Sequence, residues 1–139
     1  MEKVSECYCC NLKKSAGWIS GYYDKAVSES GLTMSQYYLL RKLAKLESAN
    51  ITVWAKEADL ERTTMVRNVK VLEKHGLIEL TEGSGKTYQL SEHGNDALEI
   101  AIPIWEEKQR EMEEFLGEDD IEALLRIASK LNHLKEKSE

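Results

Sequence analysis

A change of apolar period at Gly76 restricts the possible folds of this chain more than any other feature of its sequence. Before Gly76, the stretch "ERTTMVRNVKVLEKHG" repeats apolar residues at steps of three and four, which predicts a helix that the glycine ends. After Gly76, "LIELTEGSGKTYQL" predicts two short strands, near Leu77–Leu80 and Thr87–Leu90, joined by a glycine-containing hairpin loop. The fold must therefore let a helix run directly into a two-stranded wing.

The segments before this helix also carry helical periodicity. Apolar residues recur at steps of three and four from Tyr8 to about Ser28, and Gly31 is a suitable left-handed cap after that helix. A second helix is expected from Thr33 to about Leu46, because Thr33 and Gln36 stand at capping-box spacing. A short third helix is expected near residues 53–58. A tight break then leads into the helix that Gly76 ends, which makes a helix-turn-helix.

Two further helices follow the wing. Ser91 is placed to cap a long helix with a slight kink near Pro103, and a last helix is expected from about Asp119 to Leu134. The predicted fold is therefore mainly α (α+β), with about six helices and a two-stranded wing. We expect a single domain of 1–139, with the winged helix-turn-helix over 31–90 and dimerisation helices in 1–30 and 91–139. The long apolar stripes of the outer helices need a second subunit to cover them.

Composition excludes several classes of protein. With 139 residues and 42% hydrophobic content, the chain can bury a core without disulfides or metal. No apolar run approaches the roughly 18 residues that a membrane span requires, and the first residues lack the apolar region of a secretion signal. We therefore expect a cytoplasmic protein. No carboxylate pair and no Ser, His and Asp set stands at a catalytic spacing, so the chain is not expected to be an enzyme or to carry a cofactor.

Charge is distributed unevenly along the chain. The formal net charge is −6, but it divides into +2 for residues 1–50, 0 for 51–90 and −8 for 91–139. The stretch from Arg62 to His75 opposes this acidic total, with four basic residues against Glu73 alone. Such a charged face is most often an ordinary solvated helix surface. The order of short helix, break, helix and hairpin around it favours DNA binding instead.

At about 100° per residue, Met65, Val69 and Leu72 face the core, and Thr63 and Arg67 lie with the lysines on the opposite side. Arginine reaches guanine with two hydrogen bonds, asparagine reaches adenine, and lysines neutralise phosphates. We therefore expect the helix to enter the major groove of double-stranded DNA. The predicted DNA-binding residues, including one in the wing, are Arg62, Thr63, Thr64, Arg67, Asn68, Lys70, Lys74 and Lys86.

Three stretches in this order resemble the MarR family of winged-helix transcription regulators: "SGLTMSQYYLLRKLA", "WAKEADLERTTMVRNVKVLEKHGLI" and "YQLSEHGNDALEIAIPIW". The resemblance covers nearly the whole chain. It implies a homodimeric repressor of an inverted-repeat DNA site, released by a small effector that is often aromatic or phenolic, or by a thiol oxidant. The family's groove contacts fall on Thr63, Thr64, Arg67 and their exposed neighbours. The alternative from another class is a protein-interaction module that has lost DNA binding.

The chain departs from the family pattern at three places. Glu61 stands where an aspartate usually caps the recognition helix, and Asp59 replaces a glycine common in the turn. The wing tip "EGSGKTY" keeps only Lys86 where relatives carry an aspartate and arginines. We therefore expect weaker minor-groove contact from this wing.

The cluster "CYCC" has too few nearby ligands for a metal site, and none is expected. The resemblance to peroxide-sensing relatives places their reactive cysteine on Cys9 and one supporting tyrosine on Tyr23, while Lys13 replaces the other. The alternative role for Cys9 is a small buried hydrophobe at the dimer interface. Aromatic residues that border the family's effector cleft are Trp18, Tyr22, Tyr23, Tyr37, Tyr38 and Trp54, although core packing is the commoner role of such residues.

Overall fold

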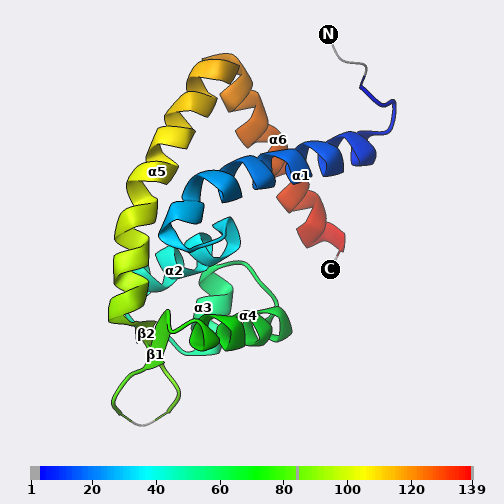
Figure 1. The fold of residues 1–139 in the computed structure, drawn as a ribbon. Helices are drawn as coiled ribbons and strands as arrows, with labels where there is room; N and C mark the ends of the chain where they lie inside the picture. Colours follow the sequence, from blue (N-terminus) through cyan, green and yellow to red (C-terminus); the bar gives the residue numbers. More distant parts are fainter. Residues whose placement is uncertain (1–3, 84, 139) are drawn as a thin grey trace. The chain divides into compact units, whose positions relative to one another are not determined.

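The structure, a computed structural model, describes residues 4–83 and 85–138 (Figure 1). Within these residues the chain forms six α-helices and a two-stranded antiparallel wing, which confirms the predicted fold class. Strand β1 pairs with β2 so that Glu79 lies opposite Gln89. The elements in chain order are α1 (Tyr8–Val27), a short 3-10 turn (Ser28–Ser30), α2 (Met34–Leu46), α3 (Ile51–Glu57), α4 (Arg62–Lys74), β1 (Ile78–Leu80), β2 (Tyr88–Leu90), α5 (Glu92–Leu116) and α6 (Glu118–Ser138).

The chain divides into two compact units, Met1–Trp105 and Glu106–Glu139. The first unit contains the core, the helix-turn-helix and the wing. The second contains the end of α5 and all of α6. The single domain of 1–139 and its division at residues 31 and 90 stay predictions.

Local hydrogen bonds place the helix boundaries where side-chain capping signals stand in the sequence. The Thr33 hydroxyl accepts the Gln36 amide at 3.2 Å, and the Gln36 side chain accepts the Thr33 amide at 3.0 Å, which confirms the capping box. Gly31 is left-handed, with φ 84°, as predicted for a cap. The Asn50 side chain accepts the Val53 amide at 2.8 Å and starts α3. Helices α2 and α3 are thus each entered through a side-chain hydrogen bond to a backbone amide.

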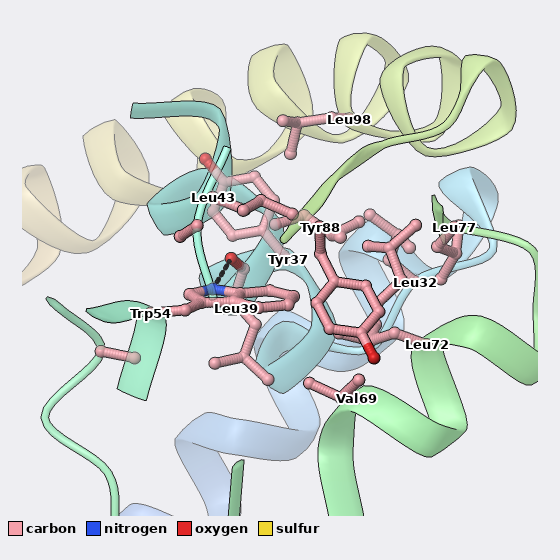
Figure 2. Packing of buried hydrophobic residues seen from close by; sticks show 14 of the residues in the cluster. Leu32, Tyr37, Leu39, Leu43, Trp54, Val69, Leu72, Leu77, Tyr88 and Leu98 are labelled. Carbon is pink, nitrogen blue, oxygen red and sulfur yellow. Dashed lines mark hydrogen bonds between the residues drawn. The ribbon is translucent and has the colours of Figure 1, made fainter. Parts of the chain in front are cut away.

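The core gathers around α2, whose Leu39, Leu40 and Leu43 are buried. Trp54 of α3 is fully buried, and its indole N–H donates to the Leu39 carbonyl at 3.0 Å (Figure 2). Burial of a tryptophan this deep would leave its N–H unsatisfied without such an acceptor. Tyr88 of the wing packs near this ring, with the ring centroids 6.5 Å apart. Helices α2 and α3 and the wing therefore share one core.

The wing is attached to this core by backbone hydrogen bonds. Ala49 and Tyr88 exchange two of them, at 3.0 and 2.8 Å, and the Leu77 amide donates to the Leu72 carbonyl at 3.0 Å. Gly94 in the first turns of α5 packs directly on the Leu77 backbone. An added Cβ at Gly94 would lie 2.0 Å from the Leu77 oxygen, so only glycine fits there. The start of α5 is therefore in close contact with the backbone just before β1.

Gly94→Ala should destabilise the protein because the new methyl group overlaps a backbone carbonyl rather than a flexible side chain. We expect a loss of about 1–3 kcal/mol, measured by urea denaturation. Gly17→Ala in α1 is the matched control, since an added Cβ there meets nothing within 4 Å. That change should be neutral or stabilise by up to about 1 kcal/mol. Equal unfolding midpoints for the two variants would contradict the close contact at Gly94.

Candidate nucleic-acid interface

The turn between α3 and α4 is held by backbone hydrogen bonds rather than by side-chain caps. The Asp59 amide donates to the Lys56 carbonyl at 3.2 Å, and the Leu60 amide donates to the Ala55 carbonyl at 2.9 Å. Asp59 is left-handed, with φ 55°, at the position where relatives carry glycine. Glu61 is the N-cap of α4 and makes no side-chain capping bond. These two departures from the family pattern therefore coincide with a strained turn and an uncapped helix start.

Helix α4 has one buried face and one basic exposed face. Met65, Val69 and Leu72 are at most 2% exposed, which confirms the predicted core face. Thr63, Arg67, Lys70 and Lys74 are all exposed, and Thr64 is half-buried at the flank. The cations lie outward because Met65, Val69 and Leu72, at steps of four and three from one another, form the opposite face and pack inward.

Two predicted DNA-binding residues already have partners within the protein. The Asn68 side-chain amide donates to the Thr64 carbonyl at 2.9 Å, one turn back along α4. The Arg62 Nε donates to the Thr52 hydroxyl at 3.4 Å and so connects α4 to α3. Arg62 keeps its remaining guanidinium N–H groups for other acceptors. Asn68 would have to rotate away from Thr64 to present its amide to a base.

The remaining cations of α4 are not neutralised by neighbours. Among residues 4–83 and 85–138, the ion pairs include none to Arg67, Lys70 or Lys74. A positive face without carboxylate partners attracts phosphates without first breaking an internal pair. The exposed face of α4 can therefore bind a polyanion without the cost of breaking an internal ion pair.

The wing carries one further predicted cation. Lys86 is exposed beside β2, in a loop where Gly83 and Gly85 have φ of 138° and 86°. The Thr81 amide donates to the Thr87 carbonyl at 2.9 Å, and the hydroxyls of the same two threonines hydrogen-bond to each other. The base of the loop is thus closed while its tip is glycine-rich. Ser84, within the tip "EGSGKTY", lies outside the described residues.

A pocket of about 580 Å³ lies against α2 and is bordered by Trp105 of α5. The Tyr37 ring stacks on Trp105, with the centroids 5.8 Å apart. The Lys42 ammonium lies 5.3 Å from the centroid of the Tyr38 ring, a cation–π contact. The pocket thus combines aromatic walls with positive charge. Its lining residues are Met34, Tyr37, Tyr38, Arg41, Lys42, Ala44, Lys45 and Trp105.

This pocket is connected to the helix-turn-helix through two contacts. The Tyr38 hydroxyl donates to the carbonyl of Ala58 at 3.1 Å, in the turn after α3. Lys45 pairs with Glu57 at 2.6 Å, and this cation is the main reason that the pKa of the Glu57 carboxyl lies below its usual value. Both contacts join the pocket wall on α2 to the end of α3. A ligand that displaces Tyr38 or Lys45 would therefore act on the turn before α4.

The structure separates the six aromatic residues predicted to border an effector cleft. Tyr37 and Tyr38 line the pocket, and Tyr37 also belongs to the core, as does Trp54. Trp18 and Tyr22 stack on each other along α1, with centroids 5.4 Å apart, and Tyr23 of the same helix is buried. Sequence reasoning missed Arg41, Lys42, Lys45 and Trp105 as lining residues. The sequence does contain a signal for the two lysines of this set, because Tyr38, Lys42 and Lys45 are spaced at steps of four and three and so share one helix face.

The three cysteines lie at the start of α1, and all are exposed. Cys7 is the N-cap residue, and Cys9 and Cys10 belong to the first turn. Within the part of the chain that the structure describes, no group of three or more His, Cys, Asp or Glu side chains could hold a metal ion. In the same residues, no helix combines the length and apolar character that a membrane crossing requires. The redox role predicted for Cys9 is untested by these observations.

Comparisons with known proteins agree with this geometry. The MarR family model matches residues 32–83. The transcriptional regulator MosR of M. tuberculosis, in a complex with DNA, is 29% identical, with a TM-score of 0.82 over 96% of this chain and 98% of that one. The transcriptional repressor CouR is 25% identical, with a TM-score of 0.83 over 96% and 97% of the two chains.

A curated relative of another kind matches part of the chain. The phenylalanine–tRNA ligase alpha subunit of Pyrococcus abyssi is 30% identical over 106 residues, which is 69% of this chain and 21% of that protein. The chain therefore spans about a fifth of the length of this relative. The match does not include enough of the ligase to carry its activity to this chain.

A helix-turn-helix with an outward basic helix and an adjoining wing defines the class of winged-helix DNA-binding transcription regulators. Within that class, the family model that matches the helix-turn-helix and wing is that of the MarR family, and the chain is similar over nearly its whole length to MosR and CouR.

Glu61→Asp should stabilise α4, because the shorter carboxylate can accept a hydrogen bond from the second or third amide of the helix. We expect a gain of about 0.5–2 kcal/mol in the free energy of unfolding, measured by urea denaturation. Glu61→Gln is the control, since it keeps the long side chain that makes no capping bond. If Asp and Gln give the same stability, the N-cap of α4 is not a weak point.

Proposed function

We propose that this chain acts as a homodimeric repressor that binds an inverted repeat in double-stranded DNA and is released by a small aromatic effector. The observation that carries the proposal is the basic face of α4, which the buried residues Met65, Val69 and Leu72 hold outward and which no described carboxylate neutralises. The DNA complex of MosR, a relative of nearly the same length, supports it.

Within this proposal the residues of α4 divide into two groups. Thr63, Thr64 and Arg67 lie toward the N-terminal half of α4, where recognition helices contact base edges. Lys70 and Lys74 lie further along the exposed face and contact phosphates. Arg62 positions α4 through Thr52 and adds a phosphate contact with its free N–H groups. Lys86 of the wing contributes a single cation to the neighbouring backbone or minor groove.

Dimerisation is supported by apolar side chains on the outer helices. On α1, Leu12 and Trp18 are 49% and 66% exposed. Taken within its own unit, α6 buries no residue although it carries a helical stripe of leucines. Apolar stripes of this length are covered in a two-fold dimer. Two α4 helices related by that symmetry would contact half-sites about 10 bp apart.

The pocket beside α2 is the proposed effector site. Its aromatic walls and the three cations Arg41, Lys42 and Lys45 favour an aromatic molecule with a negative group. A ligand carboxylate would compete with Glu57 for Lys45, and an aromatic ring would compete for the face of Tyr38. Both changes act on the end of α3 and hence on the position of α4. The effector releases DNA only if it binds the displaced arrangement more tightly.

Arg67→Ala should reduce DNA affinity by about 1–3 kcal/mol and relax the base preference at one position of each half-site. Lys74→Ala should weaken binding to all sequences alike and flatten the salt dependence. The measurement is selection of bound fragments from the source genome, followed by titration of the preferred fragment at several salt concentrations.

Lys25→Ala, in the last turn of α1, is the matched control and should leave affinity unchanged. A uniform loss across all sequences for Arg67→Ala would contradict its role in reading bases. Absence of any preferred inverted repeat would instead support an interaction module without specific DNA binding.

Benzoate should bind the protein at least about tenfold more tightly than benzylamine, because the pocket cations attract the carboxylate and repel the ammonium. Arg41→Gln should weaken benzoate binding about tenfold or more, since it removes a charge-assisted contact of about 1.5–3 kcal/mol. Calorimetric titration measures both, with Lys13→Gln on α1 as the control. Equal affinities for the two probes would exclude this pocket as an anion site.

A further inference from the structure

The hydroxyl of Ser91 connects the end of α4 to the start of α5. It donates to the Gly76 carbonyl at 2.5 Å and accepts the Gly94 amide at 3.0 Å. Gly76 follows the C-cap residue of α4, and Gly94 lies in the first turn of α5. A serine hydroxyl has only one proton, so the bond to Gly76 uses the whole of its capacity as a donor. One side chain therefore holds the ends of two helices together.

The end of α4 has a defined backbone geometry. The Gly76 amide donates to the Glu73 carbonyl at 2.9 Å, and the Leu77 amide donates to the Leu72 carbonyl at 3.0 Å. Gly76 is left-handed, with φ 70°. This pattern is the Schellman motif, in which the chain turns sharply directly after a helix. The Gly76 carbonyl that Ser91 contacts therefore has a fixed direction relative to α4.

The start of α5 is attached to the same part of the backbone. The Ser91 amide donates to the Leu77 carbonyl at 3.1 Å, and the Ser91 carbonyl accepts the Asn95 amide at 2.9 Å. Gly94 is buried against the Leu77 carbonyl, where an added Cβ would lie 2.0 Å from the oxygen. These contacts between residues 76–77 and 91–94 lie at the base of the wing (Figure 1), and we call them the α4–α5 joint.

We infer that Ser91 is a positioning residue for DNA binding, whose hydroxyl sets the angle between α4 and α5 and thereby the separation of the two α4 helices in the dimer. The inference rests on the proposed function, because this separation has a meaning only for a dimer that binds two half-sites. Ser91 acts through the Gly76 carbonyl, and its own side chain contacts no DNA.

The joint controls this separation because α5 belongs to the proposed dimerisation helices, whereas α4 carries the recognition face. A rotation at the α4–α5 joint changes the direction of α4 relative to the two-fold axis of the dimer. Each base pair between two half-sites moves them apart by about 3.4 Å and rotates them by about 35°. A rigid joint therefore favours one spacing of the half-sites, and a loose joint accepts a neighbouring spacing with a smaller loss of affinity.

Three substitutions of Ser91 separate capping of α5 from positioning of α4. Ser91→Thr keeps a hydroxyl and with it both hydrogen bonds. Ser91→Asp keeps an acceptor for the Gly94 amide and is a good N-cap, but its carboxylate has no proton to donate and repels the Gly76 oxygen. Ser91→Ala removes both bonds. A role in capping alone predicts an effect of alanine only, whereas a positioning role predicts an effect of aspartate as well.

The test uses the full chain and the inverted repeat that the wild type selects from its source genome. A second fragment carries the same half-sites with one base pair inserted between them. The spacing penalty is the ratio of the two dissociation constants, in which losses common to both fragments cancel. Ser91→Thr should keep the wild-type penalty. Ser91→Asp and Ser91→Ala should each reduce it at least about threefold, which corresponds to one lost hydrogen bond.

Urea denaturation of the same variants shows whether stability explains the effect. Ser91→Ala should raise the equilibrium constant for unfolding about fivefold through the lost cap, and Ser91→Asp should raise it less. Thr33→Ala is the matched control, because it removes the side-chain cap of α2, which is not part of the α4–α5 joint. It should raise the unfolding constant about as much as Ser91→Ala. Its spacing penalty should equal that of the wild type.

Failure of the proposed function and failure of this inference give different results. A wild-type protein that prefers no inverted repeat would overturn both. A preferred repeat with the same spacing penalty for Ser91→Asp and the wild type would overturn the inference alone. A reduced penalty for Thr33→Ala would also overturn it, because the effect would then follow from lower stability and not from the joint.

Discussion

The burial of one face of α4 sets the orientation of this helix and of every side chain on its exposed face. Met65, Val69 and Leu72 are almost completely removed from water against a core that also contains Trp54 and Tyr88. Each such side chain contributes about 1.5–3 kcal/mol when fully buried. The helix therefore cannot rotate about its axis without losing several of these contributions. Its threonines and cations are held at fixed positions on the surface by residues that are themselves buried.

The same core connects the surface of α4 to the pocket beside α2. The wall of the pocket on α2 reaches the end of α3 through Tyr38 and Lys45, and α3 reaches α4 through a turn of four residues with a left-handed Asp59. Each of these links is a direct hydrogen bond, an ion pair or a short stretch of backbone. Under the proposed function, a small displacement at the pocket would be transmitted because closely packed interiors shift as units rather than deform gradually. The proposed regulation by a small molecule would then need no large movement.

Much of this arrangement was predictable from the sequence, because it depends on local signals. The capping box at Thr33, the glycine that ends the first helix region, and the change of period at Gly76 each act through neighbours in the chain. The inward face of α4 followed from spacing alone. By contrast, the sequence signals did not separate Trp54 in the core from Tyr38 at the pocket, since both are aromatic residues at helical spacing. The sequence also did not predict that Asn68 bonds to the Thr64 carbonyl, because this bond depends on the rotamer of the asparagine side chain.

The sequence alone predicts the order of helices and wing, the boundaries set by caps and the basic character of α4, because each depends on residues that are close together in the chain. Tertiary packing was needed to show which cations line a pocket and that Gly94 must lie against the Leu77 backbone. These features depend on distances between atoms that the pattern of residue types leaves free. The physical reason is that local periodicity sets direction along an element, while packing sets what that direction meets.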